Sequence, residues 1–345
     1  MTAYFIRRFL LIIPTFLGIT LAVFVIMHFV PGGPVERAIM RIQMAALAQG
    51  GVTGGFGSSR GSASLPEGAI EQIRVYYGFD KPVHVRYALW LWKVLHLDLG
   101  TSYIYQDPVW EVIRSRFPVS IFLGLTGFFL SYFVCVPLGV FKAIRHHSRF
   151  DVVSSAIVFL GYAVPGWALG TALLVVFGGG SFWSVFPLGG FRPDNWEYLS
   201  VWGKITGQLH HMFLPVLCYM VGAFASQTIL TKNSLMENLN QDYVRTAFAK
   251  GLSERRVIFV HALRNSLIPL VTGLGNTISL ILAGSFLIER VFNIDGMGYL
   301  GYTAILQRDY PVALGILVID SVLMLVGNIL SDMIYATVDP RIRFQ

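Results

Sequence analysis

The stretch YVRTAFAKGLSERRVIFVHALRN, residues 243–265, interrupts a largely apolar chain with a short cationic segment. Its pattern predicts two helices joined by a tight turn. Residues 241–250 favour a helix, Gly251 can adopt the left-handed conformation that ends it, and Ser253 can cap a second helix with Glu254 in its first turn. The predicted apolar faces are Val244, Ala247 and Phe248 on the first helix and Val257, Ile258, Val260 and Leu263 on the second.

The cations of this stretch allow two interpretations. They are Arg245, Lys250, Arg255, Arg256 and Arg264. A loop resting on anionic lipid headgroups would explain the charge. A knob held in a groove of a partner protein would also explain why the helix stops at Gly251 and restarts at Ser253.

The composition places most of the chain in lipid. Its 345 residues are 54% hydrophobic and 13% charged, with a mean hydropathy of +0.62, whereas soluble domains are about a quarter charged. The net charge of +7 does not indicate nucleic-acid binding, because the cations lie between apolar runs rather than on a soluble face. The two cysteines, Cys135 and Cys218, lie inside apolar runs and read as small buried hydrophobes.

The fold class predicted from these features is an all-α integral membrane protein. About 20 apolar residues are needed for a helix to cross the hydrocarbon, and about six such runs occur. They cover residues 9–30, 117–141, 152–178, 212–230, 266–288 and 311–335. Proline residues within these runs are tolerated where neighbouring helices satisfy the freed carbonyl groups.

The distribution of Lys and Arg predicts the orientation. The N-terminus, 142–150, 231–265 and the C-terminal tail hold 13 of the 26, and the loops 179–210 and 289–310 hold four. Because cytoplasmic loops are enriched in these residues, we expect both termini and the cationic segment to be cytoplasmic. The predicted organisation is a tail and first span (1–30), an extracytoplasmic region (31–116), a core (117–335) containing the cytoplasmic segment 231–265, and a cytoplasmic tail (336–345).

The extracytoplasmic region contains one stretch without helical signals. Residues 48–68 are rich in Gly and Ser and are expected to form a mobile loop. Residues 69–95 predict two short amphipathic helices separated at the sequence GFDKP. Their Tyr and Trp residues suit either the membrane interface or a docking surface for an external partner.

Polar residues inside the spans are candidates for a translocation pathway. Asp320 is central in the last span, where ionisable groups are costly and often functional. It either lines the pathway and attracts a substrate's amino group, or it is protonated or paired with a polar group of a partner. Asn276, Thr277 and Ser279 lie among small residues in the fifth span, which favours helix packing, with pathway lining as the alternative.

Three charged residues near the predicted external face are candidates for a gate or docking site. These are Glu289, Arg290 and Asp309. For Glu289 and Arg290 the alternative is a solvated pair at a loop edge. No nucleophile–base motif occurs, and the adjacent His pairs lack further ligands at suitable spacing, so we predict neither a catalytic nor a metal site.

The quoted stretch, continued to Pro269, resembles the cytoplasmic coupling motif of permease subunits in ATP-binding-cassette (ABC) importers. The general motif has Glu-Ala-Ala, three residues and then Gly. Here Arg245, Thr246 and Ala247 replace Glu-Ala-Ala, with Gly251 at the same spacing. These departures are usual in the oligopeptide, dipeptide and nickel branch. PGGP (31–34), YGFDKP (77–82), LDLGTSY (97–103), FPVSIFLGL (117–125), residues 284–312 and DPRIRF (339–344) resemble the same branch. The long Gly/Ser insertion looks most like the Yej-type subgroup, associated with oligopeptides and microcin C.

The resemblance implies a type I ABC importer permease fold in a bacterial inner membrane. It implies a second homologous permease, two nucleotide-binding domains and an extracytoplasmic peptide-binding protein as partners. This chain has no phosphate-binding G-x-x-x-x-G-K-[ST] loop, so ATP and Mg²⁺ are expected on the partner ATPase subunits and no cofactor on this chain. The implied coupling residues are Arg245, Thr246, Ala247, Gly251, Ser253, Glu254, Arg255 and Arg256.

Three other functions remain to be weighed against this one. Within the same family, dipeptides or nickel chelates are alternative substrates. A stand-alone secondary transporter would show inverted repeats and several intramembrane charges, neither of which is evident. A membrane-embedded enzyme would need clustered His, Asp or Glu near one interface, which is also not evident.

Overall fold

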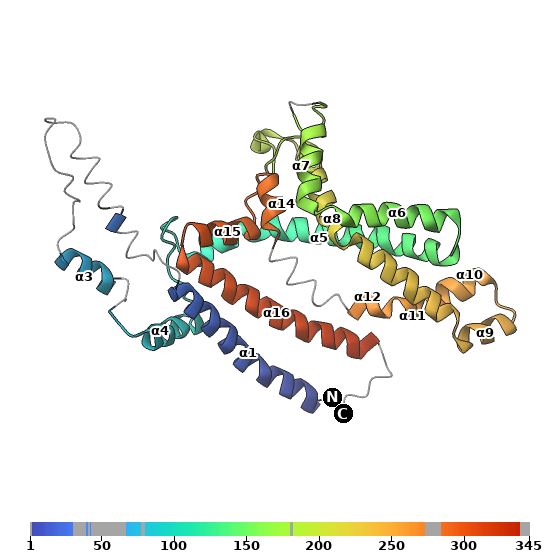
Figure 1. Cartoon of the computed structure of the whole chain (residues 1–345), viewed down its shortest axis with the longest axis horizontal. Coiled ribbons are helices and arrows are strands. Elements are labelled where there is room, and N and C mark those ends of the chain that lie inside the picture. The colour runs from blue at the N-terminus through green and yellow to red at the C-terminus, as the bar shows by residue number, and fades with distance from the viewer. Residues whose placement is uncertain are drawn as a thin grey trace. The chain divides into compact units, whose positions relative to one another are not determined.

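The computed structural model describes residues 2–29, 39–40, 42, 67–76, 80–179, 182–272 and 284–338. These residues form helices joined by turns, with two isolated β-bridges (Figure 1). The helices are α1 (Thr2–Phe29), α3 (Glu67–Tyr76), α4 (Val83–Leu95), α5 (Val109–Ile144), α6 (Arg149–Ala163), α7 (Gly166–Phe177), η1 (Trp196–Tyr198), α8 (Val201–Leu239), α9 (Asp242–Ala249), α10 (Glu254–Arg256), η2 (Val257–Ala262), α11 (Leu263–Ser266), α12 (Ile268–Thr272), α14 (Phe286–Val291), α15 (Met297–Leu306) and α16 (Tyr310–Val338).

The chain divides into two compact units. The first comprises residues 1–10, 115–300 and 320–345, and the second comprises residues 11–114 and 301–319. Among the described residues, four helices are long and apolar enough to cross a membrane: α1, α5, α8 and α16. They confirm the first, second, fourth and sixth predicted spans as helices. The middle of the fifth predicted span, 266–288, lies outside the described residues, because 273–283 are not described.

The third predicted span, 152–178, is not one straight helix. It consists of α6 and α7, which are bent by 95° at the break between them. Val164 is extended (φ −96°, ψ 118°) and Pro165 precedes α7 with φ −57°. The residue before a proline is pushed out of the helical region by a clash with the proline ring. Pro14, Pro137 and Pro215 lie inside continuous helices, whereas Pro165 stands at the break in the third span.

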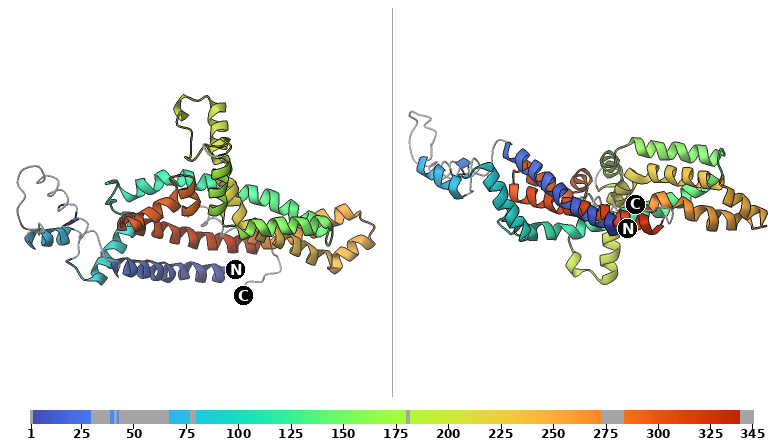
Figure 2. Two further views of the ribbon diagram at one scale, coloured as in Figure 1. Left: turned by 45° about the horizontal axis from the view of Figure 1, so that its top comes forward. Right: turned by 90° about the horizontal axis from the view of Figure 1, so that it is seen from below.

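Helix α8 is longer than the predicted span, 212–230. Its 39 residues correspond to about 58 Å at the usual rise per residue, about twice the hydrocarbon thickness. Its N-terminal cap is Ser200, whose hydroxyl accepts a hydrogen bond from the Gly203 amide at 3.2 Å. It therefore continues beyond the hydrocarbon at one or both ends, and Figure 2 shows it running on toward α9–α11.

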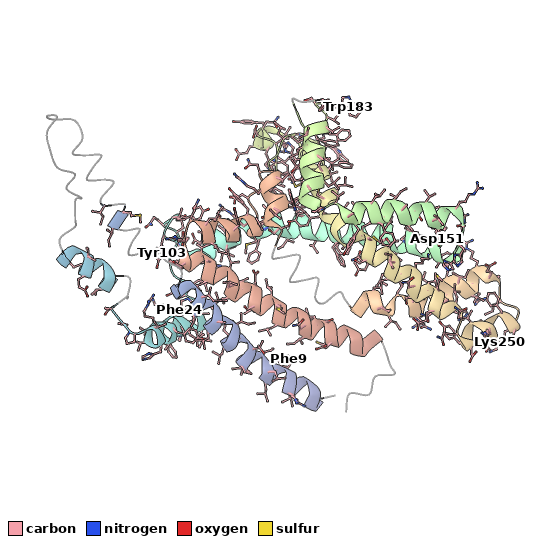
Figure 3. The ribbon with its side chains drawn as sticks, in the orientation of Figure 1. Phe9, Phe24, Tyr103, Asp151, Trp183 and Lys250 are labelled. Carbon is pink, nitrogen blue, oxygen red and sulfur yellow. The ribbon has the colours of Figure 1, made fainter. Side chains whose placement is uncertain are left out.

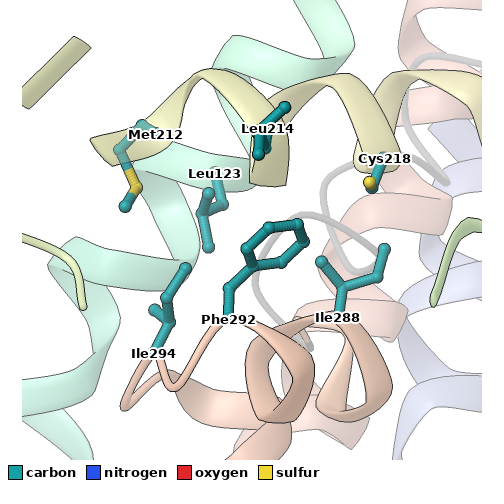
Figure 4. Packing of buried hydrophobic residues seen from close by; sticks show 7 residues of the cluster. All are labelled: Leu123, Met212, Leu214, Cys218, Ile288, Phe292 and Ile294. Carbon is teal, nitrogen blue, oxygen red and sulfur yellow. The ribbon is translucent and has the colours of Figure 1, made fainter. Parts of the chain in front are cut away.

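A buried cluster in the first unit joins α5, α8, α14 and the turn after α14, and side chains of α7 pack against it. Its members are Leu123, Met212, Leu214, Cys218, Ile288, Phe292 and Ile294 (Figure 4). Phe292 is held close to α7 because Gly170 has no side chain, and a Cβ there would lie 2.9 Å from the ring. This packing fixes the turn after α14. Helix α14 itself carries the candidate residues Glu289 and Arg290.

The second unit confirms the two short helices predicted after the Gly/Ser stretch. They are α3 and α4, and the Gly/Ser residues 48–66 themselves lie outside the described residues. Helix α4 packs on α1 through the rings of Phe24, Tyr87 and Trp90, whose centroids are 5.4–6.0 Å apart. The Tyr87 and Thr20 hydroxyls lie 3.0 Å apart, which anchors this aromatic contact.

Candidate functional site

Residues 242–266, here called the coupling segment, form the predicted helix–turn–helix. Helix α9 ends at Ala249, and Gly251 follows with φ +77°. The Gly251 amide donates to the Phe248 carbonyl at 2.9 Å and the Leu252 amide to the Ala247 carbonyl at 3.3 Å. The left-handed turn at Gly251 and the restart at Glu254 are therefore confirmed (Figure 1).

The second half of the coupling segment differs from the predicted helix. Residues 257–262 form a π-helix, with Val257, Ile258 and Ala262 buried, while Val260 is exposed. The sequence prediction assumed an α-helix here and therefore placed Val260 on the apolar face. The wider i→i+5 turn of a π-helix rotates it outward. Ser253 is at the capping position, but its side chain makes no capping hydrogen bond.

The coupling segment buries part of its apolar surface and exposes its cations together with Phe248, Phe259 and Val260, so the prediction that Phe248 packs inward is wrong. A buried cluster joins Val140 and Ala143 of α5, Leu235 of α8, and Val244, Ala247, Val257 and Ala262 of the segment. The segment's exposed residues include Arg245, Thr246, Lys250, Glu254, Arg255 and Arg256. Ala247 is among the implied coupling residues but faces this core, so its role is to seat α9 rather than to touch a partner.

The arrangement leaves the cations free for an external anion or carboxylate. Arg245 lies 3.6 Å from Asp242, and both side chains are largely exposed, so this pair contributes little. Arg255 and Arg256 occupy the last turn of α10. Figure 3 shows Lys250 at the tip formed by α9 and α10. The segment is thus a helix–turn–helix knob with exposed cations.

Substituting Gly251 is expected to loosen this knob without any steric clash. A Cβ at Gly251 would meet nothing within 4 Å, so the cost is the left-handed backbone alone, about 1–2 kcal/mol for Ala. Hydrogen exchange of the amides of 242–266 should therefore accelerate in Gly251→Ala. Gly222→Ala is the matched control, because Gly222 also has open space and lies inside α8. Equal protection in the two variants would contradict the role assigned to the turn.

Glu289 is the most completely enclosed of the candidate residues, with a relative exposure of 0%. Its Oε2 accepts a hydrogen bond from the Tyr299 amide at 2.7 Å. Its Oε1 accepts from the Ser285 amide and the Tyr219 hydroxyl, both at 3.2 Å, with the Ser120 hydroxyl at 3.5 Å. The alternative of a solvated loop-edge position is therefore wrong for Glu289.

Glycines make room for this carboxylate. A Cβ at Gly296 would lie 2.6 Å from Cδ of Glu289, and a Cβ at Gly284 (φ +71°) would collide with Oε1. Burial raises the pKa of the Glu289 carboxyl above its ordinary value, opposed by the hydrogen bonds from the Tyr299 and Ser285 amides. Glu289 thus organises the loop between α14 and α15. Sequence reasoning missed this role, although the glycines around it were the available signal.

Arg290 points away from Glu289. It is exposed, donates a hydrogen bond to the Tyr299 hydroxyl at 3.1 Å, and lies 5.6 Å from the centre of that ring. The two adjacent residues therefore have different environments, and only Arg290 is accessible to an external partner.

Asp309 is buried in the second unit and joins two motifs that are far apart in the sequence. Its carboxylate accepts hydrogen bonds from the Ser102 hydroxyl and from the amides of Tyr103 (3.1 Å) and Ile104 (3.3 Å). Its amide donates to the Ala304 carbonyl at 2.8 Å. Because Asp309 is buried, it could affect external docking only by holding the loop that contains Ser102, Tyr103 and Ile104.

Removing the Asp309 carboxylate is expected to release that loop. Asp309→Ala takes the acceptor away from the Ser102 hydroxyl and the Tyr103 amide, at a cost of about 2 kcal/mol or more. The Ile104 amide keeps the Ser102 hydroxyl as an acceptor at 3.2 Å. Limited proteolysis within residues 100–106 should become faster. The control is Asp98→Ala in the same loop, where the lost hydrogen bond to the Gly100 amide is exposed. Equal cleavage of both variants would overturn the assignment.

Of the pathway candidates, the structure describes Asp320. Asp320 lies within α16, and its Oδ1 is buried without a hydrogen-bond partner among the described residues. Asn276, Thr277 and Ser279 lie outside the described residues. In the part of the chain that is described, no cluster of His, Cys, Asp or Glu has the geometry to hold a metal ion.

The chain is similar to known transport proteins along its whole length. Residues 135–344 match the family described as binding-protein-dependent transport system inner membrane component. The chain is 41% identical to the peptidoglycan transport system permease protein YejB of Agrobacterium fabrum, covering 100% of this chain and 99% of that protein. It is 42% identical to the inner membrane ABC transporter permease protein YejB of Escherichia coli O157:H7 and 36% identical to the oligopeptide transport system permease protein AppB of Bacillus subtilis, with complete coverage of both chains in each case.

Proposed function

Because the chain belongs to the inner membrane components of binding-protein-dependent transport systems, we propose that it forms half of an ATP-driven import pathway for peptides. The observation that carries this proposal is full-length similarity to permeases named for peptidoglycan and oligopeptide transport. Oligopeptides, including peptide antibiotics such as microcin C, are the favoured substrates. Dipeptides and nickel chelates are the alternatives.

The proposed complex has five parts. This chain pairs with a second, homologous permease in the lipid bilayer, and ATP with Mg²⁺ is hydrolysed on two nucleotide-binding domains. An extracytoplasmic binding protein delivers the peptide. Both termini and the coupling segment face the cytoplasm, as the placement of Lys and Arg favours. This chain binds no cofactor and catalyses no reaction in this scheme.

The coupling segment is proposed to receive force from an ATPase subunit. Its exposed cations, Arg245, Arg255 and Arg256, would contact the ATPase, while Val244 and Ala247 transmit the displacement through the core they share with α5 and α8. Closure of the ATPase dimer would then move the spans as rigid bodies between inward-open and outward-open states. Asp320, Asn276 and Ser279 are the proposed pathway residues, with Asp320 attracting a peptide's amino group. Arg290 is the exposed candidate for external docking.

Reconstitution tests the substrate class directly. The complete complex in liposomes should accumulate labelled oligopeptide when ATP is inside and the loaded binding protein is outside. Dipeptides, nickel chelates and peptidoglycan fragments serve as competing substrates, and the complex without binding protein is the control. The proposal would be contradicted if the assembled complex hydrolysed ATP but took up no peptide of any kind.

A further inference from the structure

Three charged side chains from different helices meet near the coupling segment. Lys232 of α8 places Nζ 2.8 and 2.7 Å from the two carboxylate oxygens of Asp151 in α6. Lys142 of α5 places Nζ 3.1 Å from Oδ1 of Asp151 and donates to the Asp151 carbonyl at 3.0 Å. Figure 3 labels Asp151 where α6 begins. We call Lys142, Asp151 and Lys232 the charged joint.

The charged joint is enclosed by protein. The relative exposures of the side chains are 1% for Lys142, 6% for Asp151 and 15% for Lys232. Lys142 also donates to the hydroxyls of Ser154 (2.9 Å) and Ser155 (2.7 Å). Burying three charges is costly, and replacing such groups by apolar residues is often neutral or stabilising. Stability alone is therefore a weak explanation for the cluster.

The turn between α5 and α6 is directed at the same carboxylate. The Nδ1 atom of His146 lies 3.2 Å from Oδ2 of Asp151, and the His147 amide donates to that oxygen at 3.3 Å. The Ser148 hydroxyl accepts from the Asp151 amide at 3.3 Å. The start of α6 is thus fixed to both neighbouring helices through one residue.

The same helical turns that carry the charges also seat the coupling segment. Lys142 lies between Val140 and Ala143, and Lys232 lies one turn before Leu235. Val140, Ala143 and Leu235 belong to the buried cluster that holds Val244, Ala247, Val257 and Ala262 of the segment. The two layers, one apolar and one charged, are therefore adjacent on α5 and α8.

We infer that the charged joint carries displacement of the coupling segment into α5, α6 and α8 as one body, an inference that rests on the proposed function. Apolar contacts alone permit sliding between helices, whereas a carboxylate held by two ammonium groups fixes direction and register. Lys142 and Lys232 lie on the helices that contact the segment, and Asp151 lies on α6, which leads to the bend at Pro165. These residues act by positioning the helices and do not contact the substrate.

Lys232→Met tests this inference without leaving a buried charge unpaired, because Lys142 and Asp151 remain as a neutral pair. In the reconstituted complex, the variant is expected to keep its ATPase subunits and its basal ATP hydrolysis. Peptide imported per ATP is expected to fall about tenfold, which corresponds to a coupling energy within the usual range. Lys232→Arg should restore the ratio, since it can still pair with Asp151.

Lys204→Met is the matched control, because Lys204 lies on the same helix but outside the charged joint. Its Nζ atom lies 5.8 Å from the centre of the Trp196 ring. An unchanged import ratio in Lys232→Met, equal to that of Lys204→Met, would overturn the inference while leaving the proposed function intact. Absence of peptide-dependent import in the wild-type complex would instead remove the proposed function.

If Lys232→Met does not assemble, Lys232→Gln takes its place, because its amide can still donate a hydrogen bond to Asp151 but carries no charge. An assembled Lys232→Gln complex is expected to import less peptide per ATP than Lys232→Arg. An equal import ratio in these two variants overturns the inference. Failure of Lys232→Gln to assemble assigns the cluster to folding alone and overturns it as well.

Discussion

A Glu289→Ala variant is expected to lose at least about 3 kcal/mol of stability, because the Tyr299 amide and the Tyr219 and Ser120 hydroxyls would lose a buried acceptor. The Ser285 amide would keep its hydrogen bond to the Tyr219 hydroxyl at 2.8 Å. The glycines around the carboxylate cannot fill the vacated space. Thermal unfolding of the purified protein in detergent measures this loss. Glu289→Gln should fall between wild type and Ala, since an amide keeps one acceptor oxygen.

The matched control for this loss is the neighbouring residue. Arg290→Ala removes an exposed side chain and one hydrogen bond to Tyr299, so its effect on stability is expected to stay within about 0.5 kcal/mol. Equal unfolding temperatures for Glu289→Ala and Arg290→Ala would show that the buried carboxylate does not organise the loop.

The double variant Arg255→Glu/Arg256→Glu is expected to abolish peptide-stimulated ATP hydrolysis. Both side chains are exposed at the last turn of α10, so the substitution leaves the buried core of the coupling segment intact. Reversal of two charges at a complementary interface places like charges against each other, which costs several kcal/mol. The measurement is the ATP hydrolysis of the complex in liposomes, with and without the loaded binding protein.

An equivalent charge change outside the coupling segment separates docking from lipid contact. Arg145 and Arg149 are also exposed and flank the turn between α5 and α6, on the same predicted face of the membrane. If the cations served only orientation or headgroup binding, Arg145→Glu/Arg149→Glu would have the same effect as the Arg255 and Arg256 variant. We expect this control to keep its stimulation by peptide.

Features governed by local sequence were predicted correctly. Four of the predicted spans are helices, because long apolar runs form helices wherever water is excluded. The stop at Gly251 followed from the freedom of glycine at positive φ. The sequence analysis did not distinguish Pro165 from the other prolines in the spans. A proline alone does not decide whether a helix breaks, since Pro14, Pro137 and Pro215 leave their helices continuous.

Features that depend on contacts distant in sequence were not predicted. Glu289 and Asp309 looked like external charges, but each is enclosed by groups up to about 200 residues away in the chain. The charged joint has the same origin, since Asp151 and Lys232 are 81 positions apart. The π-helix after Arg256 has no local signal in residues that favour an ordinary helix.

Cross-linking from the tip of the coupling segment tests the coupling role most directly. A single Lys250→Cys variant needs no further change, because Cys135 and Cys218 are buried, with exposures of 0% and 1%. Tyr198→Cys, 92% exposed in the predicted external loop, is the control. In a complex that imports peptide, a short bifunctional thiol–amine reagent should join Cys at position 250, but not Cys at position 198, to an ATPase subunit. If position 250 in such an active complex reacts but never joins an ATPase subunit, the segment does not couple ATP hydrolysis to transport.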